Sequence, residues 1–292
     1  MRSPFLLLAA SLLGAQAPRP AAPAPPQAPA VRVTRGFNNP ESALWDAAGK
    51  CWYVSNLVGG TNARDGRAFL SKLDADGRIV EKTWIQGLDA PKGLGIVGRT
   101  LYAADIDKVD VIDLAKGQLV RRIPVQGATF LNDIAVGPTG DVFVSDMERS
   151  VIYRLRPGGK AEVFLADRRL ECPNGLWVEG GTLYVAAWGA ISGPGFATRE
   201  PGRLLKVDLR SKAIEPFGAP RLGNLDGLVR LGAHCYVTDY RAGKVFKVAE
   251  DGSATLWRGG FMSAADLGLD PVRRLLAVPD MAAGTVTFAQ AD

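Results

Sequence analysis

Short apolar runs separated by turn residues dominate the chain. The segment 130–146 (FLNDIAVGPTGDVFVSD) is the clearest example, because a brief apolar run, a Gly-Pro-Thr-Gly turn and a second run follow one another. In the second run Val142 and Val144 alternate with Phe143 and Ser145. A period of two residues is typical of a β-strand with two different faces, and glycine and proline supply the turn. The segment therefore predicts a β-hairpin with polar residues at both outer ends.

The same hairpin pattern recurs six times along the chain. Each copy begins with a residue that we call the anchor, and the six anchors are Glu41, Lys92, Asn132, Asn174, Asp226 and Ala265. Successive anchors are 51, 40, 42, 52 and 39 residues apart, and strand patterns follow the hairpins. Four strands per unit at a period near 40 are typical of propeller blades. The sequence therefore predicts an all-β fold, a six-bladed β-propeller with four-stranded antiparallel blades.

The last repeat has room for only three strands, at 265–269, 275–278 and 285–288. Another strand pattern, Val31 to Thr34, lies before the first anchor. We expect this N-terminal strand to complete the last blade and to close the ring. The propeller domain is accordingly predicted over residues 31–292.

The blade topology predicts that the anchors lie together. The innermost strand of a blade begins at the face where the second strand ends, so the anchors should surround the mouth of the central channel. Two blades insert about ten extra residues after their second strand, at 57–67 and 189–203. We expect these loops to form the rim of a pocket on the anchor face. Plain surface loops are the alternative.

Composition and charge are those of a folded protein without a nucleic-acid partner. The chain is 47% hydrophobic and 22% charged, which excludes disorder of the whole chain. The formal net charge is +5, but Lys and Arg are scattered and suggest no basic groove. The sequence indicates a small-molecule substrate as partner, and it indicates no oligomeric state.

The N-terminus resembles an export signal. Arg2 precedes the apolar run 4–14, and Ala15 to Ala17 form an A-x-A pattern. We therefore predict a signal peptide at 1–17, a Pro/Ala-rich linker at 18–30, and a periplasmic or secreted protein. Pro18 directly after the pattern leaves the cleavage position open. The run is short for a membrane span, so no membrane contact is expected beyond this segment.

The anchors themselves carry the candidate chemistry. Four of them have side-chain oxygens: Glu41, Asn132, Asn174 and Asp226. Two carboxylates and two amides, without His or Cys, form a hard oxygen donor set for one divalent cation. Ca²⁺ is the first choice, with Mg²⁺ and Mn²⁺ as alternatives. Four protein ligands would leave room for water or substrate. A hydrogen-bonded polar plug in the channel is the competing interpretation.

Four short motifs in order resemble one family. The segment around Glu41 (NNPES), Asn132 with Asp133, the Pro-Asn-Gly turn at Asn174, and Asp226 with its following glycine are similar to the SMP-30/gluconolactonase/LRE-like family. Similar propellers occur in the calcium-dependent phosphotriesterase superfamily. The likeness extends over about residues 36–290. It implies a divalent-metal-dependent lactone hydrolase.

The resemblance also implies roles for individual residues. Glu41, Asn174 and Asp226 would be metal ligands, and Asn132 would contact metal-bound water or substrate. Asp226 would also be the general base for an attacking water. The only histidine, His234, should lie some 16 Å below the mouth, at roughly 3.3 Å per residue along its strand. Its position argues against a histidine-assisted mechanism.

Three other residues are predicted to contact substrate. Phe130 occupies a position where sugar-lactonase members of the family often have arginine, so it favours a less polar lactone or ester. Lys92 stands in the anchor ring, where it could pair with a carboxylate, bind a substrate oxyanion or reach solvent. Trp188 should offer an apolar wall. It is expected at the position that Asp105, Asp146, Asp239 and Asp280 occupy in other blades, where aspartate should hold a turn.

Two functions remain open from the sequence. The first is an exported metal-dependent hydrolase of a lactone or related ester. The second is a non-catalytic propeller, like NHL or YncE modules, that binds a ligand or protein at the channel mouth. A cysteine nucleophile is not favoured, because the three cysteines are accompanied by a single histidine. Their odd number leaves at least one cysteine free.

Overall fold

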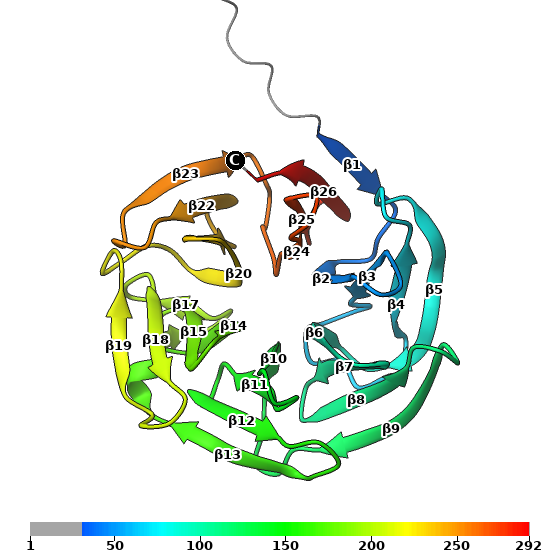
Figure 1. The fold of residues 1–292 in the computed structure, drawn as a ribbon, viewed down its shortest axis with the longest axis horizontal. Coiled ribbons are helices and arrows are strands. Elements are labelled where there is room, and N and C mark those ends of the chain that lie inside the picture. Colours follow the sequence, from blue (N-terminus) through cyan, green and yellow to red (C-terminus); the bar gives the residue numbers. More distant parts are fainter. Residues whose placement is uncertain (1–30, 292) are drawn as a thin grey trace, which may run out of the picture.

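Six four-stranded antiparallel sheets surround a central axis in the computed structural model, which describes residues 31–291 (Figure 1). Every sheet is radial, with its first strand beside the axis and its last strand on the outside. The predicted six-bladed β-propeller is therefore confirmed. The predicted signal peptide and the linker at 18–30 lie outside the described residues.

In blades one to five, the strands follow the chain from the axis outward. Blade one contains β2 (Pro40–Asp46), β3 (Cys51–Asn56), β4 (Ala68–Leu73) and β5 (Ile79–Leu88). Blade two contains β6 (Pro91–Val97), β7 (Thr100–Asp105), β8 (Lys108–Asp113) and β9 (Gln118–Pro124). Blade three contains β10 (Leu131–Val136), β11 (Val142–Asp146), β12 (Val151–Leu155) and β13 (Ala161–Ala166).

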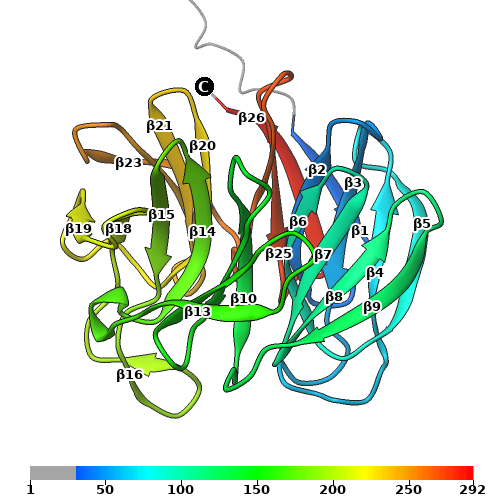
Figure 2. The same cartoon turned by 60° about the horizontal axis from the view of Figure 1, so that its bottom comes forward.

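The second half of the ring repeats this order with one insertion. Blade four contains β14 (Pro173–Glu179), β15 (Thr182–Ala187), β18 (Leu204–Asp208) and β19 (Ile214–Phe217). Its insertion forms a small hairpin of β16 (Ile191–Gly193) and β17 (Ala197–Thr198). Blade five contains β20 (Leu225–Leu231), β21 (His234–Asp239), β22 (Lys244–Val248) and β23 (Ala254–Gly259). Figure 2 shows β16 at one end of the ring, outside the radial sheets.

The last blade is completed by the N-terminal strand, as predicted. Its strands are β24 (Gly268–Asp270), β25 (Leu275–Asp280), β26 (Thr285–Gln290) and β1 (Arg32–Arg35). β1 pairs antiparallel with β26 over four residues, with Val33 opposite Thr287. Since β1 precedes blade one and β26 ends blade six, this pairing joins the two ends of the ring.

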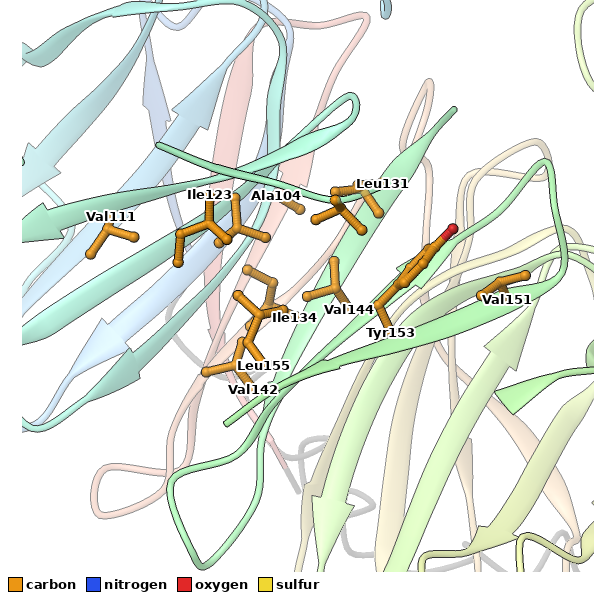
Figure 3. Packing of buried hydrophobic residues seen from close by; sticks show 12 residues of the cluster. Ala104, Val111, Ile123, Leu131, Ile134, Val142, Val144, Val151, Tyr153 and Leu155 are labelled. Carbon is orange, nitrogen blue, oxygen red and sulfur yellow. The ribbon is translucent and has the colours of Figure 1, made fainter. Parts of the chain in front are cut away.

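The hydrophobic core is divided into layers between neighbouring blades. Figure 3 shows the layer between blades two and three, where Ile123 belongs to the same cluster as Leu131, Ile134 and Val144. These side chains come from alternate positions of their strands, so one face of each sheet packs against the next blade. The core therefore surrounds the axis and leaves the axis to polar residues.

Helical structure is minimal in the described part of the chain. It is limited to a 3-10 turn, η1 (Arg168–Leu170), between blades three and four. Within residues 31–291, no helix has the length and apolar character needed to cross a membrane.

Candidate functional site

Five of the six anchors meet in one cavity at the end of the central channel. The cavity has a volume of about 400 Å³. We call its deepest polar residues the polar floor, and they are Glu41, Lys92, Asn132, Asn174 and Asp226. Ala265 has the equivalent place in blade six but does not line the cavity. The sequence prediction that anchors from separate blades converge is therefore confirmed.

A β-bulge in the first strand of each of five blades directs the anchor toward the axis. In blade one, Pro40 pairs with Asn56 and Ala43 pairs with Val54. The two residues at 41 and 42 therefore lie opposite the single residue Ser55. The same irregularity occurs at the corresponding place in blades two to five. The backbone N–H of Ser42 is satisfied by Ser55 Oγ at 2.9 Å instead of by the ladder. Such bulges commonly re-aim a side chain next to a functional site.

Below the polar floor, the residue after each anchor forms a second ring. Three of its members are glycines, and the others are Ser42, Asp133 and Asp266. A Cβ atom at Gly93 would overlap Asp133, and one at Gly227 would overlap Asp266. The glycines therefore make room for two buried carboxylates near the axis.

The two carboxylates of this second ring differ in their partners. Asp133 accepts hydrogen bonds from the backbone N–H groups of Ile134 and Leu176, both at 2.6 Å. Asp266 accepts one from Ser42 Oγ at 2.5 Å. Asp133 therefore links blade three to blade four, and Asp266 links blade six to blade one.

Three oxygen atoms of the polar floor are buried without a hydrogen-bond partner. They are Glu41 Oε2, Asn174 Oδ1 and Asp226 Oδ1, from blades one, four and five. Buried polar atoms are nearly always paired in folded proteins, and an unpaired one costs about 1–3 kcal/mol. Three such atoms facing one cavity point to a ligand that all three would bind.

The carboxyl groups around the channel raise one another's pKa. Burial is the main cause for Glu41, whose pKa lies well above its usual value, and the nearby Asp226 adds to it. Burial and Asp266 raise the pKa of Asp226, while a hydrogen bond from Asn174 opposes this. Burial also raises the pKa of Asp133, and that of Asp266 to about 7. A cation among these groups would favour their ionised forms.

The donor set of the floor fits a hard divalent cation. Among the described residues, no group of three His, Cys, Asp or Glu side chains is arranged to hold a metal ion. A metal would therefore need the amide oxygen of Asn174 beside the carboxylates of Glu41 and Asp226. Such mixed carboxylate and amide oxygen sets are typical of Ca²⁺, with room for water or substrate.

Lys92 is buried in the floor and faces the aromatic side of the cavity. Its side chain is only 1% exposed, and Nζ donates to the carbonyl oxygen of Ala90 at 3.1 Å. Nζ also lies 4.5 Å from the centre of the Phe130 ring. Burial lowers the pKa of Lys92 to about 8, although Glu41 favours its charged form. The sequence left three possibilities for Lys92, and its burial excludes a solvent-exposed ammonium. Within the described residues, no carboxylate forms an ion pair with it.

Above the floor lies a ring of apolar residues, of which the sequence patterns identified only Trp188. Each follows directly after the second strand of its blade. We call those that line the cavity the apolar collar, and they are Leu57, Met147, Trp188, Tyr240 and Met281. The sequence contains a signal for them, because each lies one residue after the last residue of its second strand.

The structure corrects the predicted register of Trp188. Ala187 pairs with Pro173, as Asp146 pairs with Leu131, so Ala187 takes the place of the aspartate in blade four. Trp188 is one residue further along, in the apolar collar. It still lines the cavity, as expected for an apolar wall.

The aspartates that end second strands hold turns, as predicted. Asp105 accepts from the N–H groups of Asp89 and Ala90, at 2.9 and 2.8 Å. Asp146 and Asp280 accept similar bonds from the segments before their own blades' anchors. His234 begins β21, at the end opposite Asp239 and the cavity. All three cysteines are free and buried.

The two insertions contribute to the rim of the cavity. The first provides Leu57 and Thr61, and the second provides Gly195 and Phe196 from the β16–β17 hairpin. Phe196 packs against Phe130 with ring centres 5.0 Å apart. The expectation that both insertions surround a pocket on the anchor face is therefore confirmed.

Comparison with known proteins supports the fold but does not assign the chain to a family. No family model matches the chain, and no curated protein matches it. Among solved structures, a gluconolactonase of Xanthomonas campestris is similar with a TM-score of 0.68 and 16% identity, over 89% of each chain. A virginiamycin B lyase of Staphylococcus aureus has a TM-score of 0.60 and 12% identity, over 90% of this chain and 99% of its own. A streptogramin B lyase has a TM-score of 0.60 and 10% identity, over 90% and 98%.

Proposed function

We propose that this protein is a divalent-metal-dependent hydrolase of a lactone or related ester, of the SMP-30/gluconolactonase type. The observation that carries the proposal is the set of three unpaired oxygens of Glu41, Asn174 and Asp226 around one cavity. Since they come from three blades, their convergence is a property of the whole ring. The structural likeness to a gluconolactonase supports the same reaction class.

A divalent cation bound by these oxygens would polarise a substrate carbonyl and lower the pKa of a nearby water. Ca²⁺ suits the oxygen set best, with Mg²⁺ and Mn²⁺ as alternatives. The carboxylate of Asp226 has a second oxygen besides the one assigned to the cation, and this oxygen can accept the proton of an attacking water. No serine or cysteine nucleophile is required.

The other floor residues would position the substrate. Asn132 Nδ2 donates a weak hydrogen bond to Met147 Sδ at 3.7 Å. The side-chain oxygen of Asn132 can therefore bind a water or a substrate hydroxyl. Nζ of Lys92 donates to a single carbonyl acceptor of the polypeptide, so its other hydrogens are available. It can therefore donate to a substrate oxygen on which negative charge develops. Phe130 and Trp188 exclude water from the reacting groups.

The decisive experiment combines cation binding with turnover. With Ca²⁺ at 100 times its dissociation constant, the wild type should gain about 2.7 kcal/mol of stability against unfolding. Asp226→Ala and Asn174→Ala should lose this gain, as thermal melts with and without EDTA would show. Hydrolysis across a lactone and ester panel should fall by roughly 10²–10⁴-fold in Asp226→Ala, because both a ligand and the proton acceptor are removed.

Asp251→Ala is the matched control, because Asp251 lies in the β22–β23 turn outside the cavity. Its cation response and turnover should equal those of the wild type. Equal melting shifts in wild type and Asp226→Ala would exclude the metal site. Absence of turnover in a protein that binds the cation would favour the non-catalytic propeller.

A further inference from the structure

We propose that the cavity selects lactones or esters with an apolar alkyl or aryl substituent, and discriminates against polyhydroxylated substrates such as sugar lactones. This inference rests on the proposed function and names the substrate class of the same site. It is carried by the apolar collar and by the aromatic contact between Phe130 and Phe196.

The polar floor and the apolar collar lie at different depths. In blade one, Pro40 pairs with Asn56, so Glu41 is one residue deeper and Leu57 one residue further out. Two residues along a strand correspond to roughly 7 Å. A substrate whose carbonyl reaches the floor therefore has its substituent within the collar.

The collar offers few free polar groups to a substrate. Trp188 Nε1 already donates to the carbonyl oxygen of Phe196 at 2.9 Å. The hydroxyl of Tyr240 interacts with Ser263. The remaining members are Leu57, Met147 and Met281. Sugar hydroxyl groups would lose water here without gaining partners, which is costly, whereas alkyl and aryl groups gain from leaving water.

The β16–β17 hairpin holds an aromatic residue over this space in an unusual conformation. Phe196 has a φ of 58°, in the left-handed region that a bulky residue rarely adopts, next to Gly195 with a φ of 62°. Arg241 donates to the carbonyl oxygen of Gly195 at 2.8 Å and lies 5.6 Å from the Trp188 ring. Strain of this kind is found where the surroundings fix a functional group. Here it places Phe196 against Phe130 at the cavity.

The first test is a chain-length series. The substrates are γ-butyrolactone, γ-hexalactone, γ-octalactone and γ-decalactone, with D-glucono-δ-lactone as the polar comparison, all with Ca²⁺ present. The kcat/KM should rise up to about fourfold per added methylene until the collar is filled. The alkyl lactones should exceed the sugar lactone. A flat series, or preference for the sugar lactone, would overturn the inference.

The second test measures binding without chemistry. The probes are γ-lactams with the same alkyl chains, because their amide rings resist hydrolysis, and calorimetry reports their affinity. Phe196→Ala should reduce the affinity for the longest lactam more than for the shortest, and Phe196→Leu should restore most of the dependence. Ser192→Ala is the control in the same hairpin, because Ser192 is exposed outside the cavity. An unchanged dependence in Phe196→Ala would contradict the assignment.

The two tests separate the inference from the proposed function. If lactam affinity rises with chain length but no lactone or ester is hydrolysed with any cation, the hydrolase is excluded and the ligand class stands. If lactones are hydrolysed at rates independent of chain length, the hydrolase stands and the apolar substrate class is excluded.

Discussion

Acidic residues near the axis have different roles although they look alike in sequence. Asp146 accepts backbone hydrogen bonds in a turn, and Asp133 connects two blades. Asp226 has an oxygen without any partner. The number of hydrogen bonds that each carboxylate already accepts decides which of them is available for chemistry.

Asp110 is a buried carboxylate outside the cavity, and it predicts a pH-dependent stability. Neither oxygen has a hydrogen-bond partner, although Arg122 Nε lies 3.4 Å from Oδ1. Burial, together with the neighbouring Asp105, raises the pKa of Asp110 to about 8. Between pH 4 and 8 the folded state keeps a proton that the unfolded chain has lost. Stability therefore falls as pH rises through this window.

Asp110→Asn should remove this dependence. Relative to wild type, the variant should gain stability as pH rises from 5 to 8.5, by at least about 1 kcal/mol at the upper end. Thermal melts across this pH range provide the measurement. Asp113→Asn, in the same strand, is the control, because backbone bonds hold the pKa of Asp113 low and its effect should be constant above pH 5. A constant difference for Asp110→Asn would contradict the prediction.

First strands approach one another closely around the axis, and glycine permits this approach. A Cβ atom at Gly175 would overlap the carbonyl oxygen of Asp226, in the neighbouring first strand. Both strands carry a bulge at this place, so their backbones face each other at the second ring. The geometry of the polar floor therefore depends on a residue without a side chain.

Gly175→Ala should destabilise the protein by about 1–3 kcal/mol, because the backbone must move to accept the methyl group. It should also weaken cation binding, since Asp226 moves with its strand. Gly181→Ala in the β14–β15 turn is the matched control, because its Cβ would meet nothing within 4 Å. Denaturant unfolding and calorimetry with Ca²⁺ report the two effects. Equal stability of both variants would show that the blades are not in close contact here.

At the scale of the whole molecule, ring closure depends on four residues at the N-terminal side. β1 pairs with β26 through Val33 opposite Thr287 and its neighbours, and Thr34 Oγ1 donates to the carbonyl oxygen of Gly77 at 2.6 Å. β1 therefore contacts both blade six and blade one. Without it, the junction would keep its inner contacts, such as the hydrogen bond from Ser42 to Asp266, but it would lose its outer strand and β26 would become an exposed edge.

A chain that begins at residue 37 should be less stable than one that begins at residue 31, by about 2–4 kcal/mol for the lost hydrogen bonds and packing. Circular dichroism melts of the two proteins measure the difference. The chain from residue 31 should match the full protein, since it keeps β1. Identical melting temperatures of the two shortened chains would mean that β1 does not close the ring.

Much of this architecture was predictable from local patterns. Turn residues and two-residue alternation in segments such as 130–146 predict hairpins, and six copies predict six blades. The anchors could be located because Asn132 and its equivalents stand at a fixed place in each repeat. The other members of the apolar collar were not predicted, because they lie one residue beyond the repeated aspartates. Trp188 was placed one residue too early, because blade four has Ala187 where other blades have the aspartate.

The sequence by itself determined the fold, the ring closure and the residues at the mouth of the channel, because these follow from a repeated local pattern. Only the tertiary structure decided which oxygens remain unpaired, that Lys92 faces Phe130, and that Phe196 meets Phe130 from another blade. Those facts depend on distances between blades that are far apart in sequence. They arise from bulges, glycines and burial, whose combined effect no single repeat contains.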